Sequence, residues 1–272
     1  MPQYVPTDAD VEAAADRLIE AAATRAACAP VRDLIGRDDV GAAYAVQRLV
    51  NERRIENGAV VTGRKIGLTS RAVQEQLGVD RPDFGVLFAD MNYADASVLP
   101  LDHVIAPRVE AEVAFVLAHD LTDGDLGTDE VADAVAYAVA ALEIVDSRID
   151  KWDISFSDTV ADNGSSGLYV LGEEQVSLDV FVPVHCEMRM LVDGVEASAG
   201  TGRACLGDPL AALSWLAQIS CDVGQPLRAG EVILSGALGP MVPAAAGMEA
   251  VAEITGLGAV SCRFGERISA AT

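Results

Sequence analysis

The sequence predicts an α+β protein in which a small helical N-terminal part is attached to a larger, mixed β domain. Apolar residues recur at helical spacing through residues 8–57. From about residue 60 the pattern changes to short apolar runs bounded by Gly, Pro and Asp. Strands and helices do not alternate regularly, which disfavours a doubly wound parallel sheet. We therefore expect a helical segment at 1–59 and a β domain at 60–272.

The helical part divides into two stretches, 8–27 and 39–58. Pro30 and Gly36 separate them, and Gly58 ends the second, as these residue types commonly do at helix boundaries. Within the β domain the helical pattern returns in three stretches: TSRAVQEQLG (69–78), TDEVADAVAYAV (128–139) and DPLAALSWLAQIS (208–220).

Seven apolar runs in the second part have the length and composition of strands. They cover residues 59–66, 108–117, 141–149, 167–172, 185–194, 231–236 and 248–264. Asp193–Gly194 is a hairpin turn signal, and the last run contains its own turn at Gly256–Gly258. No internal repeat divides the chain.

The composition limits the partners of the protein. Forty-two acidic and 19 basic residues give a formal charge of −23, so a nucleic-acid backbone would be repelled. The N-terminus has no basic and apolar signal pattern, and no run approaches the roughly 18 apolar residues of a membrane span. Five scattered cysteines without CxxC spacing indicate reduced thiols in a cytoplasmic protein. The three histidines lack metal-ligand spacing, so oxygen atoms would have to hold any metal.

The strand PRVEAEVAFVL (107–117) carries two glutamates on one face. Glu110 and Glu112 are two residues apart, so both side chains point the same way with Cα atoms roughly 6.5–7 Å apart. A solvated strand face is the simplest interpretation. However, Ala114 and Val116 continue the same face with apolar side chains, which places the glutamates at the mouth of a pocket.

A third acid, Glu143, lies inside the apolar run VAALEIV. A buried carboxylate must be protonated, paired with a base or bound to a cation. If Glu143 meets Glu110 and Glu112, each pair repels by about 4 kcal/mol at ~4 Å and an effective dielectric constant of ~20. A hard divalent cation would relieve all three, and an all-carboxylate site of this kind suits Mg²⁺ or Mn²⁺.

Six motifs, in order along the chain, resemble the 2-hydroxypenta-2,4-dienoate hydratases of the fumarylacetoacetate hydrolase superfamily. They are GRKIGLTS (63–70), RPDFGVLF (81–88), PRVEAEVAFVL (107–117), LEIVDSRI (142–149), ADNGSSGLYVLG (161–172) and ILSGALGPMVPA (233–244). The resemblance runs from about Val60 to the C-terminus and includes the helical N-terminal segment. It implies a fumarylacetoacetase C-terminal-like mixed β-roll, with 60–272 as the catalytic β domain.

The resemblance also implies roles for particular residues. The metal ligands would be Glu110, Glu112 and Glu143, in agreement with the charge argument. The catalytic residues would be Lys65, Asp83 and Ser165, and the substrate-binding residues Asn163, Leu68 and Arg108. Arg108 could instead neutralise Glu110 from outside the site. For Lys65, we expect burial near a metal to lower the pKa.

The reaction so implied adds water to 2-hydroxypenta-2,4-dienoate, or a substituted analogue, and gives 4-hydroxy-2-oxopentanoate in the meta-cleavage catabolism of aromatic or steroid rings. The metal would stabilise the enolate, a proton would move to C5 and water would add at C4. The resemblance further implies a homo-oligomer, a pentamer or decamer, with a small anionic substrate and a downstream aldolase as a candidate partner.

Three other functions stay open from the sequence. A 4-oxalocrotonate decarboxylase would share the metal acids and the lysine, although ALGPMVPA is more typical of hydratases. A C–C bond hydrolase of the superfamily would need a histidine after Asn92–Tyr93, where this chain has Ala94, Asp95 and Ala96. A non-catalytic oligomeric binding protein on the same scaffold would not need Lys65.

Overall fold

The structure, a computed structural model, describes residues 5–70, 74 and 81–267. The predicted helix at 69–78 therefore lies largely outside the described residues. Within the described part of the chain, no helix is long and apolar enough to cross a membrane.

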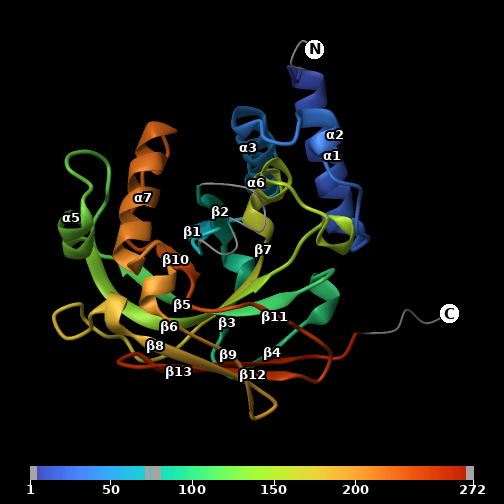
Figure 1. The fold of residues 1–272 in the computed structure, drawn as a ribbon. Helices are drawn as coiled ribbons and strands as arrows, with labels where there is room; N and C mark the ends of the chain where they lie inside the picture. Colours follow the sequence, from blue (N-terminus) through green and yellow to red (C-terminus); the bar gives the residue numbers. More distant parts are fainter. Residues whose placement is uncertain (1–4, 71–73, 75–80, 268–272) are drawn as a thin grey trace.

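The N-terminal helices are α1 (Asp8–Thr24), α2 (Arg32–Ile35) and α3 (Val40–Glu56). Thr7 begins α1 through a capping box with Asp10, and the Asp39 side chain accepts a hydrogen bond from the first turn of α3. These helices gather around α6 (Phe156–Ala161), which comes from the middle of the chain (Figure 1). Their shared apolar core contains Leu18, Val31, Ile35, Val46, Phe156 and Val160.

The larger sheet has eight strands in the order β2-β1-β10-β5-β6-β7-β3, with β11 paired to β5. Most pairs are antiparallel, but β1 with β10 and β3 with β7 are parallel. The strands are β1 (Val61–Gly67), β2 (Asp83–Phe88), β3 (Asn92–Ala94), β5 (Arg108–Leu117), β6 (Val135–Val145), β7 (Ser166–Leu171), β10 (Val232–Ala237) and β11 (Val242–Pro243).

The second sheet has five strands in the order β4-β13-β12-β8-β9 and lies beneath the larger one in Figure 1. Its strands are β4 (Ser97–Leu99), β8 (Glu187–Val192), β9 (Val195–Thr201), β12 (Glu249–Ile254) and β13 (Gly258–Phe264). The main core includes side chains of both sheets and of the helices α5 (Thr128–Asp133) and α7 (Pro209–Asp222).

The described residues also form six short 3₁₀ turns: η1 (Ala89–Met91), η2 (Leu101–His103), η3 (Asp150–Trp152), η4 (Asn163–Ser165), η5 (Pro183–His185) and η6 (Gly202–Ala204). The α+β class and the turn at Asp193–Gly194 are as predicted, since residues 193–194 connect β8 to β9.

The structure corrects the predicted helix at 128–139. Helix α5 ends at Asp133, and Val135–Val145 form the long central strand β6. This strand is hydrogen-bonded to β5 on one side and β7 on the other, and most of its side chains are buried. Burial of both faces gives an Ala/Val-rich run without the alternation that marks a strand, so the local pattern could not separate the two states.

The pairing of β5 with β6 prepares the site. In this antiparallel register Glu110 lies directly opposite Glu143, and Ala141 lies opposite Glu112. Side chains of Val109, Ala111 and Val113 face the core between the two sheets. The glutamates therefore project from the other face of the larger sheet, where Ala114 belongs to a separate apolar cluster.

Candidate active site

Three buried carboxylates meet on the face of β5 and β6. Glu110, Glu112 and Glu143 are exposed by 7%, 0% and 1%, and one ligand oxygen from each lies within 4.8 Å of the others. Cross-strand neighbours in an antiparallel pair approach to about 5 Å, which explains how residues 33 positions apart come together. The convergence that the charge pattern predicted is present.

This clustering changes the acidity of the carboxyl groups. Burial, with repulsion from Glu143, raises the pKa of Glu110 to about 8 despite the attraction of Lys65. The pKa of Glu112 is raised well above its usual range by burial and by repulsion from Glu143 and Glu110. A negative charge on Glu110 or Glu112 is therefore unfavourable in the protein alone.

A hard cation fits this group of oxygens. Glu112 Oε2 accepts a hydrogen bond from Gly236 N at 2.7 Å, but Glu112 Oε1 and Glu143 Oε2 have no hydrogen-bond partner among the described residues. Buried carboxylate oxygens are rarely left without a partner. A divalent cation would satisfy them and offset the mutual repulsion, and an all-oxygen donor set suits Mg²⁺ or Mn²⁺.

Lys65 is the cation that the chain itself supplies to the site. It comes from β1, and its Nζ lies 3.2 Å from Glu143 Oε1. Burial by itself would lower the pKa of Lys65, but attraction to Glu143, Asp83, Glu110 and Glu112 outweighs burial and raises this pKa. The predicted lowering is therefore wrong for the protein alone, because four acids surround the amine.

Asp83 lies beside Lys65 at the start of β2, opposite Gly67 of β1. Burial raises its pKa, while Lys65 lowers it and Glu143 raises it again. A Cβ atom added to Gly67 would lie 2.1 Å from Asp83 Oδ1 and 3.3 Å from Lys65 Nζ. The glycine in the KIG sequence therefore leaves the space that the Asp83 carboxylate occupies next to the lysine.

The segment before β7 reaches the site through Ser165 but not through Asn163. Ser165 Oγ lies 3.3 Å from Thr159 Oγ1, and both residues line the cavity beside Lys65 and Asp83. The side-chain amide of Asn163 is instead hydrogen-bonded to the backbone of β2. Its Nδ2 donates to Val86 O, and its Oδ1 accepts from Val86 N, each at 2.8 Å.

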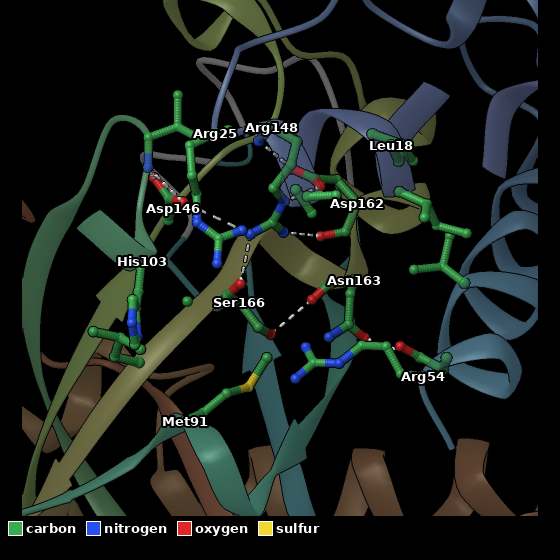
Figure 2. A pocket seen from close by; sticks show the side chains of 18 of the residues that line it. Leu18, Arg25, Arg54, Met91, His103, Asp146, Arg148, Asp162, Asn163 and Ser166 are labelled. Carbon is green, nitrogen blue, oxygen red and sulfur yellow. Dashed lines mark hydrogen bonds and ion pairs between the residues drawn. The ribbon is translucent and has the colours of Figure 1, made fainter. Parts of the chain in front are cut away.

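The predicted substrate contact of Asn163 is therefore corrected to a structural one. Its side chain lines a different cavity, on the other side of the segment, which Figure 2 shows. A sequence such as DNGSS cannot reveal which side chains of a turn point to which side, because that depends on the backbone angles of each residue.

Arg108 has no carboxylate partner among the described residues. Its guanidinium carbon lies 4.4 Å above the Trp152 ring, and Nη1 donates to Met241 Sδ at 3.7 Å. Trp152 is in turn fixed by a hydrogen bond from its Nε1 to Ala106 O at 2.9 Å. An unpaired guanidinium held in place on an aromatic ring is suited to binding an anion. The alternative role of Arg108, neutralising Glu110, is not what the geometry shows.

Beside the carboxylates lies a cavity of about 260 Å³, and Glu110 is the member of the triad that lines it. Its polar lining includes Lys65, Asp83, Arg108, Glu110, Thr159 and Ser165, and its apolar lining includes Leu68, Val145, Trp152, Ile154 and Met241. Leu68 therefore lines the cavity, and its contact with the substrate stays a prediction. The described residues that line the cavity include no histidine.

The backbone around the cavity is unusually strained. Leu68, Lys151, Trp152 and Ser165 have φ values of 56°, 55°, 57° and 54°. Such angles are uncommon for residues other than glycine, and they concentrate at functional sites because the surrounding structure must hold them.

Sequence patterns did not reveal Gly67, Thr159, Trp152 or Met241. Met241 belongs to the ALGPMVPA motif and Gly67 to the KIGLTS motif. The resemblance therefore included both residues, but it predicted no role for either. Thr159 and Trp152 had no local signal, because a threonine in a short helix and a tryptophan after an acidic turn are compatible with many structures.

Residues 63–264 match the model of the fumarylacetoacetate (FAA) hydrolase C-terminal family. The chain is 51% identical over 259 residues to a 2-keto-4-pentenoate hydratase of Burkholderia vietnamiensis, covering 95% of this chain and 99% of that one. It is 50% identical over 254 residues to the TodF product hydratase of Pseudomonas putida, covering 93% and 95%.

Among solved structures, the 4-oxalocrotonate decarboxylase of Pseudomonas putida G7, complexed with magnesium and adipate, superposes with a TM-score of 0.91 at 29% identity. The match covers 96% of this chain and all of that one. The family and the β-roll fold expected from the six motifs are thus confirmed, and the chain belongs to the fumarylacetoacetate (FAA) hydrolase family.

Proposed function

We propose that the protein is a divalent-metal-dependent hydratase that adds water to 2-hydroxypenta-2,4-dienoate, or an analogue with a short substituent, and forms 4-hydroxy-2-oxopentanoate. The observation that carries the proposal is the buried triad Glu110, Glu112 and Glu143 with Lys65 against it, below a cavity of substrate size. Relatives about half identical over nearly the whole chain are named as hydratases of this kind, which supports the same chemistry.

The three glutamates would hold the cation. A bound divalent cation would act as a Lewis acid toward the carboxylate and 2-oxygen of the substrate and stabilise the negative charge that develops there. Arg108, fixed on Trp152 and free of acid partners among the described residues, binds the carboxylate from the mouth of the cavity.

The proton transfers fall to the pair on β1 and β2. Asp83, whose pKa is raised by burial, would deliver a proton to C5 of the dienol while the 2-hydroxyl group releases its proton, which restores the acid. The water that adds at C4 then supplies the proton that C3 gains. Lys65, kept protonated by its acidic neighbours, orients the 2-oxygen through a hydrogen bond. The hydroxyl groups of Ser165 and Thr159 position the water that adds at C4.

A 4-oxalocrotonate decarboxylase is the second candidate, because a second carboxylate on the substrate could bind to the unpaired Arg108. The close superposition with such an enzyme concerns the fold and does not choose between the two reactions. As further parts of the proposal, we expect Mg²⁺ or Mn²⁺ as the cation, a cytoplasmic homo-oligomer, a pentamer or decamer, and a downstream aldolase that consumes the product.

The decisive experiment follows the dienol absorbance of 2-hydroxypenta-2,4-dienoate and the appearance of 4-hydroxy-2-oxopentanoate. We expect turnover with Mg²⁺ or Mn²⁺ and none with EDTA. Lys65→Met should lower kcat by about 10²–10³-fold, the usual effect of removing one fixed hydrogen-bond donor from an oxygen on which negative charge develops. Arg189→Met, which removes an exposed cation on β8, is the matched control and should keep full activity.

Two results would contradict the proposal. Release of CO₂ from 2-oxohex-3-enedioate without any hydration of the dienoate would assign the decarboxylase. Turnover that survives complete removal of metal would show that the carboxylate triad has another purpose.

A further inference from the structure

A second cavity lies between the N-terminal helices and the β domain. Its volume is about 350 Å³, larger than that of the cavity above the carboxylates. It is bounded by α1 and α3 on one side and by residues 161–163 and 166–168 on the other. The described residues of the proposed catalytic group, Lys65, Asp83 and the three glutamates, do not line it.

Three arginines from separate parts of the chain converge on this cavity. Figure 2 shows the side chains of Arg25, Arg54 and Arg148 turned toward the same space. Burial lowers the pKa of Arg54. The attraction of Asp90 raises it, whereas the positive charges of Arg148 and Arg25 lower it further. In a chain of charge −23, a concentration of 3 of its 19 basic residues around one cavity is notable.

The acids around the cavity do not occupy all the arginine donors. Arg148 uses its guanidinium on the Asp162 carboxylate and on the backbone oxygens of Asp162 and Ser166. Arg54 donates only through Nη2, to Asp90, so among the described residues its Nε and Nη1 have no hydrogen-bond partner. A guanidinium has five N–H donors, and a carboxylate or another anion is their preferred acceptor.

Arg25 is similar, and it approaches from the end of α1. Its Nε donates to Asp102 O at 3.1 Å, and within the described part of the chain neither Nη atom has a hydrogen-bond partner. Asp146 does not compete for it, because its two oxygens accept hydrogen bonds from Ile105 N and Ala106 N. Among the described residues, the guanidinium N–H groups at the cavity that stay without an acceptor are therefore those of Arg25 and Arg54.

A ligand in this cavity would also need a hydrogen-bond donor, because the side-chain oxygen of Asn51 has none among the described residues. Asn51 is exposed by only 7%, and its Nδ2 donates to Asn163 Oδ1 at 3.1 Å. The hydrogen bonds of Asn163 with Val86 fix that oxygen as an acceptor, so the amide of Asn51 cannot be reversed. Asn51 Oδ1 is left without a partner among the described residues, one turn before Arg54 on α3.

From these observations we propose that the cavity is a binding site for a short hydroxycarboxylate. Its carboxylate binds to the free N–H groups of Arg54 and Arg25, and its hydroxyl group donates to Asn51 Oδ1. The volume of about 350 Å³ accommodates a chain of about five carbons, since it exceeds that of the cavity proposed to take a five-carbon substrate. This site does not depend on the proposed hydratase activity.

The test is calorimetric titration of the full-length, EDTA-treated protein with 4-hydroxypentanoate, which lacks the 2-oxo group needed for chelation. We expect one site per chain, with pentanoate binding about fivefold more weakly because it lacks the hydrogen bond to Asn51. Arg54→Gln should weaken binding by about tenfold or more. Ala22→Phe, which fills the cavity from α1, should abolish binding.

Two variants serve as controls. Ala13→Phe places the same side chain at an exposed position of α1 and should bind like the wild type. Arg108→Gln removes the cation of the other cavity and should also leave this affinity unchanged. The inference is overturned if the wild type binds neither acid at millimolar concentration, if Ala22→Phe binds normally while folded, or if Arg108→Gln rather than Arg54→Gln abolishes binding.

Discussion

Glu112 is the most enclosed of the three carboxylates. It is 0% exposed, and Gly236 N is its one hydrogen-bond donor among the described residues. Since burial and two neighbouring acids raise its pKa, the negative charge at this position is unfavourable unless a cation is bound. The same carboxylate should therefore destabilise the metal-free protein and stabilise the metal-bound one.

Glu112→Gln should separate these two effects. Without metal, the variant should be at least as stable as the wild type, because the amide keeps the shape and removes the repulsion. With Mg²⁺ or Mn²⁺ at about 100 times Kd, the wild type should gain about 2.7 kcal/mol of unfolding free energy and the variant much less. Thermal unfolding with EDTA and with metal measures both. An undiminished metal-dependent shift in Glu112→Gln, with Glu249→Gln as the exposed control, would contradict the triad as the metal site.

Gly67→Ala should damage the site by crowding it. The new methyl group would overlap Asp83 Oδ1, so the carboxylate must leave the neighbourhood of Lys65. We expect most activity to be lost and the unfolding free energy to fall by about 1–3 kcal/mol. Gly41→Ala on α3 is the control, because the atom nearest to its new Cβ, Asp39 Oδ1, would be 3.6 Å away. This variant should keep full activity, and its unfolding free energy should not fall. Full activity of Gly67→Ala would show that Asp83 has no role there.

At the scale of elements, α6 connects the helices to the site. Its N-terminal turn is held by Asp158, which is 0% exposed. Asp158 Oδ2 accepts hydrogen bonds from Ser155 N and Ser155 Oγ and from Arg32 Nη1, while Oδ1 accepts from Arg32 N. One carboxylate thus caps α6 and binds it to the start of α2, and the same helix presents Thr159 to the cavity.

Asp158→Ala should cost about 3 kcal/mol of unfolding free energy, because it leaves Arg32 and the first turn of α6 without their buried acceptor. Asp153→Ala is the matched control: it removes the other carboxylate on Arg32, which is 69% exposed, and should cost much less, because water screens an exposed ion pair. Urea unfolding measures both. Equal losses in the two variants would mean that the buried carboxylate contributes no more than a surface ion pair.

In the whole molecule, the secondary structure changes from helices to strands near residue 60, but one hydrophobic core contains residues from both sides of this boundary. Leu18 and Val46 from the N-terminal helices pack with Ile149, Phe156 and Val160 from the β domain. We propose that residues 1–59 and 60–272 fold together. A chain of residues 60–272 should lose cooperative unfolding, measured by circular dichroism during heating, because this core would be open to water. A cooperative transition at the temperature of the full chain would make the N-terminal part an independent unit.

Much of the site was predictable because it depends on local rules. A spacing of two residues on a strand directs Glu110 and Glu112 to one face, and an acid within an apolar run, such as Glu143, requires a partner whatever the fold. The same rules predicted the N-terminal helices and the strand 108–117 with its bounds.

The rest depended on contacts between residues distant in sequence. Parallel pairing of β1 with β10 joins Lys65 to Leu234, and no local pattern specifies a partner 169 residues away. The strand β6 appeared helical for the same reason, since only its two neighbours determine that it is extended.

The sequence by itself determined the chemistry of this protein: an acidic chain with three carboxylates suited to a hard cation and a lysine in a motif of its family. Only the tertiary structure decided how those groups act on one another. It placed four acids around Lys65 and so reversed the expected direction of its pKa, turned Asn163 away from the site, and stacked Arg108 on Trp152 with no acidic partner among the described residues. Electrostatic effects depend on distance and burial, and those are properties of the fold.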